Sequence, residues 1–102
     1  MKISEMTIEM IASYVRLDYE ELSDEEKQEL ETMLTAAKSF IYGYTGLTQE
    51  EADTHEDFPI VVYVLCQDMY DNRTLYVDKN NLNRVVDTIL GMHSKNLIPE
   101  VI

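Results

Sequence analysis

The sequence has no tryptophan, one cysteine, two prolines and three glycines. Because a single cysteine, Cys66, cannot form a disulfide within the chain, a secreted module held by internal disulfides is excluded. Three glycines are too few for the glycine-rich loops that bind nucleotide phosphates. The sequence also lacks the His-Glu-x-x-His, Cys-x-x-Cys and Gly-x-Ser-x-Gly motifs of common enzymes. We therefore expect a protein that is not an enzyme and that binds no cofactor.

Basic residues are scarce. Eight Lys and Arg stand against 20 Asp and Glu, which gives a net charge of −12. Residues 1–72 hold 17 acids and 4 bases (−13), whereas residues 73–102 hold 3 acids and 4 bases (+1). Such a chain repels DNA phosphate and has no run of basic residues, so sequence-specific DNA binding is not expected. Two interpretations of the acidity stay open: a solvated surface, or a face toward a basic partner or a DNA conduit.

Long hydrophobic runs are also missing. The longest apolar stretch, residues 60–66, is far shorter than the roughly 20 residues that cross a bilayer. The chain begins Met1-Lys2-Ile3-Ser4-Glu5, with an acid where a signal peptide needs apolar residues, so we expect an intracellular origin. A length of 102 residues with 45% apolar residues fits one domain over residues 1–102, with no membrane partner.

Apolar periodicity predicts two helices in the first half of the chain. The first covers residues 8–16, with Thr7 as the N-cap, although Ser4 could start it earlier. The second is long, because a capping box at 23–26 starts it and Thr45-Gly46 ends it. Gly43, inside its last turns, implies either fraying or the close approach of another backbone, and we favour fraying.

Two further helices are predicted in the second half. Thr48 caps a short helical turn, and Asp57 then caps a third helix that carries Pro59 in its first turn. Residues 60–66 are apolar on every face, which indicates a helix surrounded by others; a buried strand is the competing interpretation. After a loop or short extended segment at 74–80, Asn80 or Asn81 caps a fourth helix whose apolar face ends before Gly91. The prediction is an all-α bundle of about four helices with a flexible C-terminal tail.

The tail and one helix end are the candidate protein-binding regions. The tail, residues 91–102, has apolar residues without helical spacing, which either pack on the domain or bind a partner. The Tyr, Asn and Arg at the end of the third helix either cap free carbonyl groups or anchor an interface. The candidate interface residues are Tyr70, Asn72, Arg73, Ile98, Val101 and Ile102.

One segment, residues 53–57, collects side chains of the metal-ligand types. It lacks the glycine and distal glutamate of a calcium loop, and its lone histidine cannot complete a zinc site with its neighbours alone. We interpret it as a solvated acidic loop with no metal, and His93 as a cation at a helix end. A metal-dependent enzyme remains a lesser alternative, which predicts divalent-metal uptake that is lost on changing Asp53 and His55. Cys66, in the most apolar segment, is expected in the core.

In this order and spacing, the segments resemble the small head-tail connector proteins of tailed bacteriophages, also called head-completion, adaptor or DNA-packaging connector proteins. The resemblance covers most of residues 5–90. The segments that carry it are Val15-Arg16-Leu17-Asp18, the Ser23-capped long helix that ends Ile41-Tyr42-Gly43-Tyr44-Thr45-Gly46, the Pro59-led helix that ends Met69-Tyr70-Asp71-Asn72-Arg73, and a final apolar helix. Gly43, residues 74–80 and the tail depart from the family pattern.

The resemblance implies a helical, non-enzymatic virion subunit at the head-tail junction, made in the bacterial host cytoplasm. Such proteins assemble as a ring beneath the portal, extend the DNA channel and give the tail or a stopper protein a docking surface. The implied partners are further copies of the chain, the portal protein and a tail-side stopper or completion protein. DNA would pass through the channel without sequence-specific binding. The alternative is a small acidic adaptor that binds a basic protein without forming a ring.

Overall fold

The structure, a computed structural model, describes residues 1–94. These residues form five α-helices, four of which have seven or more residues, and contain no strand. The all-α prediction is confirmed, and the strand alternative for residues 60–66 is wrong. Residues 95–102, with the predicted interface residues Ile98, Val101 and Ile102, lie outside the described part. The elements in chain order are η1 Ile3–Glu5, α1 Ile8–Tyr14, η2 Tyr19–Glu21, α2 Asp24–Thr45, α3 Gln49–Ala52, α4 Phe58–Asn72, η3 Lys79–Asn81 and α5 Arg84–His93.

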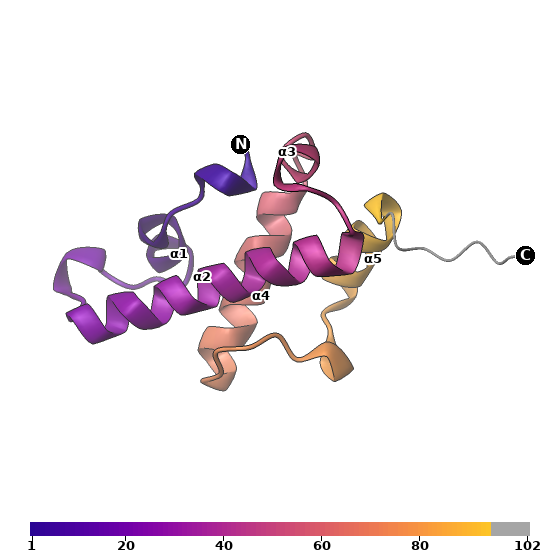
Figure 1. Cartoon of the computed structure of the whole chain (residues 1–102). Helices are drawn as coiled ribbons and strands as arrows, with labels where there is room; N and C mark the ends of the chain where they lie inside the picture. Colours follow the sequence, from indigo (N-terminus) through magenta and orange to yellow (C-terminus); the bar gives the residue numbers. More distant parts are fainter. Residues whose placement is uncertain (95–102) are drawn as a thin grey trace, which may run out of the picture.

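The two longest helices, α2 and α4, cross and form the centre of the molecule (Figure 1). The helix α1 and the 3-10 turn η1 pack on one side of this pair, and α5 packs against α4 and α2. Each of the four main helices buries its apolar stripe, and full burial of one such side chain stabilises the fold by roughly 1.5–3 kcal/mol. The central core residues are Leu30, Leu34, Ala37, Ile41, Val61, Val62, Leu65, Cys66 and Met69.

The predicted helix starts are mostly confirmed. The Ser23 hydroxyl accepts from the Glu26 backbone N–H (3.1 Å), and the Glu26 carboxylate accepts from the Ser23 N–H (2.9 Å). These hydrogen bonds with Ser23 lower the pKa of Glu26. Thr48 caps the short helix α3 through the same kind of capping box. Thr7 caps α1, so the helix does not begin at Ser4, which instead belongs to the separate turn η1.

The start and end of α5 differ from the prediction. Asn83, not Asn80 or Asn81, caps the helix, because its side-chain oxygen accepts from the Val85 N–H at 2.8 Å. The carboxylate of Asp78 instead binds Asn80 and Asn81 in the turn η3, which keeps both asparagines out of the helix. The helix also runs through Gly91 to His93 rather than ending before it.

The glycines of α2 behave differently from each other. Gly46 ends the helix in the left-handed conformation (φ 73°), and its N–H donates to the Tyr42 carbonyl at 2.9 Å, as predicted. The predicted fraying at Gly43 is wrong, because α2 continues to Thr45. Among residues 1–94, a Cβ added at Gly43 would meet no atom within 4 Å, so close approach of a backbone in this part of the chain does not explain the glycine.

Asp57 stands at the N-cap position of α4, but its side chain accepts no capping hydrogen bond. The prediction that the Asp57 side chain caps α4 is therefore wrong, because its carboxylate contacts His93 of α5 instead. Pro59 lies in the first turn of the helix as predicted. Within residues 1–94, no helix combines the length and apolarity needed to cross a bilayer.

Candidate functional site

The predicted helix-end residues are brought together at the end of α4. Arg73 ends the helix in the left-handed conformation (φ 58°), and the Thr74 N–H donates to the Met69 carbonyl at 2.9 Å. The guanidinium of Arg73 lies 5.4 Å from the Tyr70 ring centre, within cation–π range. The Asn72 amide donates to the Asp68 carbonyl of its own helix at 2.9 Å. These contacts organise the helix end, while Asn72 and Arg73 remain exposed.

Beside this helix end, an open groove of about 550 Å³ runs along α2. We call it the α2 groove; its lining residues are Ala36, Ser39, Phe40, Gly43, Tyr44, Leu75, Tyr76, Val77 and Lys79. The segment after α4 supplies its most exposed apolar side chains, Leu75 (47% exposed) and Tyr76 (65%). Since Gly43 has no side chain, α2 contributes only backbone atoms at this point of the groove.

A second exposed apolar surface, the α4 patch, consists of Tyr14, Ile60 and Tyr63. The rings of Tyr14 and Tyr63 stack with centroids 4.7 Å apart and planes 23° apart. Ile60 lies three residues before Tyr63 on the same face of α4 and is 51% exposed. The expectation that helices surround this segment on every side is therefore wrong for Ile60.

The acidic residues of the first half concentrate at one end of the molecule. All eight acids between residues 18 and 31, on η2 and the first turns of α2, are exposed. Lys27, the single base of this segment, has its ammonium 4.6 Å from the Tyr19 ring centre. Within residues 1–94 the structure records one ion pair, and it lies elsewhere. This end of the molecule is thus a predominantly anionic surface.

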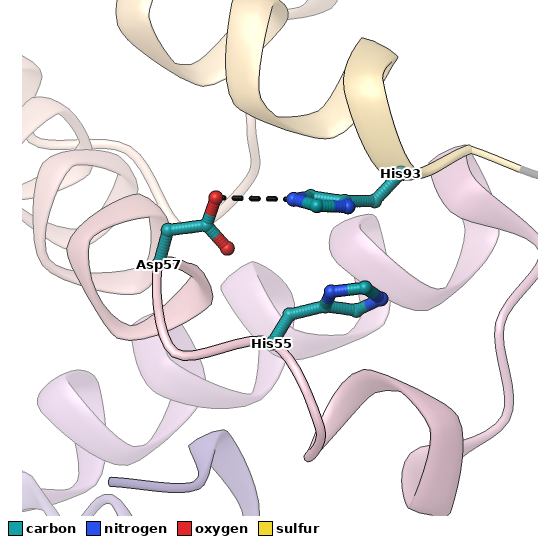
Figure 2. Close-up of side chains that lie close together, drawn as sticks. All are labelled: His55, Asp57 and His93. Atoms are coloured by element: carbon teal, nitrogen blue, oxygen red, sulfur yellow. Dashed lines mark hydrogen bonds and ion pairs between the residues drawn. The ribbon is translucent and has the colours of Figure 1, made fainter.

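That ion pair belongs to a cluster of His55, Asp57 and His93, which we call the histidine cluster (Figure 2). Nε2 of His93 lies 3.1 Å from Oδ2 of Asp57, and the rings of His55 and His93 have centroids 3.9 Å apart. Phe58 packs against both rings, at 4.8 and 5.5 Å between centroids. All three cluster residues are half-buried. The cluster joins the turn before α4 to the last turn of α5.

The side chains of the predicted segment 53–57 contact different parts of the molecule. The Asp53 carboxylate turns to the N-terminus, where it accepts from the Ser4 hydroxyl at 2.6 Å and from the Ser4 N–H at 3.1 Å. This hydroxyl hydrogen bond lowers the pKa of Asp53. Glu56 is exposed, as a solvated loop predicts, but His55 and Asp57 meet His93 instead. Sequence reasoning missed this meeting, because the partner lies 36 residues after Asp57.

Cys66 is fully buried, and burial raises the pKa of its thiol to about 12. A thiol with such a pKa stays protonated near neutral pH and is a poor nucleophile. Its predicted place in the core is confirmed.

Comparisons of the chain with protein-family models, with curated proteins and with solved structures give no match.

Proposed function

We propose that this chain is a non-enzymatic structural subunit of a tailed-phage virion, a head-tail connector protein that assembles as a ring beneath the portal. In this role it extends the DNA channel and joins the head to the tail or to a stopper. The observation that carries the proposal is the presence of two unlike exposed apolar surfaces on one small helical domain. A ring closes through a heterologous interface, in which one surface of a subunit contacts a different surface of the next.

The two surfaces are separate enough to bind two neighbours at once. Ile60 of the α4 patch lies in the first turn of α4, whereas Leu75 of the α2 groove follows its last turn. A helix of 15 residues is about 22 Å long. The two surfaces also share no residue, so one neighbouring copy would not compete with the other for side chains. We therefore assign the occupant of each surface to a further copy of this chain.

Charge supports the same head-to-tail arrangement. The α2 groove includes Lys79, whereas the neighbouring cleft that Leu75 also lines holds Arg73 together with Glu26 and Glu29. These bases belong to residues 73–102, which carry +1, while residues 1–72 carry −13. Lys79 therefore offers the acidic part of the next copy a counter-charge in the groove. Such attraction raises the association rate and weakens with added salt.

The exposed acids at 18–31 have a use in such a ring. A lumen lined by carboxylates would let DNA pass without adhering, because it offers no Lys or Arg contact to phosphate. A solved ring that carried these acids on its outer surface would exclude this role for them.

Assembly can be measured on the purified chain. Sedimentation velocity over a wide concentration range, then electron microscopy alone and with the portal protein of the encoding phage, should show rings or a portal complex. Replacing Leu75 and Tyr76 together with serine should abolish both, because it removes the exposed apolar part of the groove without touching the core. Met92→Ser is the matched control: Met92 is a similarly exposed apolar residue (70%) outside both surfaces, and this variant should assemble normally.

A chain that forms neither a ring nor a portal complex would argue against the connector proposal. The anionic surface at 18–31 would then favour the second candidate, an adaptor that binds a basic protein. That candidate predicts a monomer or dimer at every concentration, and partner binding that is lost when these acids, rather than Leu75 and Tyr76, are neutralised.

A further inference from the structure

The histidine cluster contains the chain's two histidines together with one carboxylate. His55 and Asp57 come from the turn between α3 and α4, and His93 from the last turn of α5 (Figure 2). One atom that can bind a metal from each residue lies within 4.8 Å of the others. We propose that these three side chains form a binding site for one zinc-type transition-metal cation.

The ligand types select the class of metal. Two imidazole nitrogens and one carboxylate oxygen suit Zn²⁺ and its neighbours Co²⁺ and Ni²⁺. Ca²⁺ and Mg²⁺ prefer sets made of oxygen atoms alone. Three protein ligands leave the fourth position of a tetrahedral zinc ion for a water molecule.

The distances are close to those of a bound site. Zinc bonds of about 2.0–2.2 Å place neighbouring ligand atoms roughly 3.3 Å apart in a tetrahedron. Nε2 of His93 and Oδ2 of Asp57 are already 3.1 Å apart. The rings of His55 and His93 lie 3.9 Å apart between centroids and are tilted by 34°, so the side chains adjust on binding until their nitrogen lone pairs converge on one ion. The cation then replaces the hydrogen bond between His93 and Asp57.

The second carboxylate oxygen of Asp57 gives independent support. Among residues 1–94, Oδ1 of Asp57 is the buried side-chain polar atom with no hydrogen-bond partner. Leaving such an acceptor unpaired is costly, because it has lost its water without gaining a donor. The residue also stands at an N-cap position without capping the helix. A cation beside this carboxylate accounts for both facts, since it compensates the anionic group that faces the two histidines.

The site would hold α5 against the start of α4. His93 is the last residue of α5, and Phe58, at the start of α4, closes one side of the cluster with an apolar ring. A bound ion would therefore fix the point from which the chain continues into residues 95–102. This role is independent of ring assembly, so the two proposals can fail separately.

The test uses the full chain without a histidine tag, because a tag would itself bind the metal. Titration with Zn²⁺ against a chromophoric chelator should show one saturable site per chain. His93→Gln and Asp57→Asn should each weaken binding by about tenfold or more, since each removes one ligand. Glu56→Gln, which changes an exposed neighbouring acid outside the cluster, should bind as the unchanged chain does.

A second measurement decides the matter even if a variant fails to fold. Imidazole nitrogen resonances of the unchanged chain should shift for both histidines on adding one equivalent of Zn²⁺, since both are ligands. Shifts of both rings together with the loss of affinity in the variants would establish the site. Absence of saturable binding, a shift of one ring alone, or equal affinity in His93→Gln would overturn it.

Discussion

Two helices of this protein end in the same backbone conformation but with different residues. At the end of α2, Gly46 has φ 73°, and at the end of α4, Arg73 has φ 58°. Glycine adopts this left-handed conformation without steric cost, whereas a residue with a Cβ is strained there. The end of α2 is also the buried one, because Thr45 and Leu47 on either side of Gly46 belong to the interior.

The difference separates a structural helix end from one that carries an exposed side chain. At α2, the hydrogen bonds of Thr45 and Gly46 close the helix and lead the chain into the core. At α4, the strained position keeps a guanidinium on the surface, over the ring of Tyr70 and beside the cleft that Leu75 lines. An arginine retained at some cost to stability is consistent with a role in binding another molecule.

The largest expected effect concerns the threonine at each helix end. The buried Thr45 hydroxyl donates to the Ile41 carbonyl at 2.7 Å and accepts from the Leu47 N–H at 3.2 Å. Thr45→Val keeps the shape but leaves that buried N–H unpaired, which should lower the free energy of unfolding by about 2 kcal/mol. The matched change Thr74→Val, at the exposed end of α4, should cost less than about 0.5 kcal/mol. Urea denaturation of both variants measures this difference in the free energy of unfolding. Equal losses in the two variants would contradict the contrast between a buried and an exposed helix end.

A smaller effect is expected at the two left-handed C-cap residues themselves. Gly46→Ala places a Cβ at positive φ and should lower the free energy of unfolding by about 1–2 kcal/mol. Arg73→Gly relieves the same strain and should leave stability unchanged or raise it by up to about 1 kcal/mol. The same variant should also reduce ring assembly if Arg73 contacts a second copy. A marked loss of stability on Arg73→Gly would show instead that its contact with Tyr70 holds the helix end.

The smallest effect is a pH dependence at the end of α2. The Tyr44 hydroxyl donates to the Asp87 carboxylate at 2.8 Å, and this hydrogen bond, with burial and the carboxylate charge, raises the pKa of Tyr44. Since the folded state keeps the proton that the unfolded state loses near pH 10, this contribution to stability is present below that pH and is lost above it. Between pH 9 and 11, the free energy of unfolding should fall less steeply in Tyr44→Phe than in the unchanged chain. An identical fall in the variant and the unchanged chain would show that the hydrogen bond contributes nothing to stability.

Much of the fold could be predicted, because it depends on local rules. The capping boxes at Ser23 and Thr48 and the glycine at 46 are recognised within a few residues of sequence. The errors came where two local candidates competed, as at the start of α5, where the carboxylate of Asp78 binds Asn80 and Asn81 and leaves Asn83 to cap the helix.

The candidate sites were less predictable, because they join distant residues. Tyr70 and Arg73 are near in sequence, and their association could be proposed from spacing alone. The α2 groove is formed by two segments more than 30 residues apart, and the apolar triplet at 75–77 was its single local sign. The histidine cluster had no such sign, since periodicity says nothing about which turn meets the end of α5.

The link between Ser4 and Asp53 has a consequence for the order of folding. Ile3, beside Ser4, is fully buried, and the turn that contains both residues packs on α4. The binding surface of this turn thus lies in a helix that is complete only at Asn72. During synthesis, we expect this turn to remain undocked until α4 has emerged and crossed α2. A segment that precedes α4 in the sequence would then reach its native place only after α4 is complete.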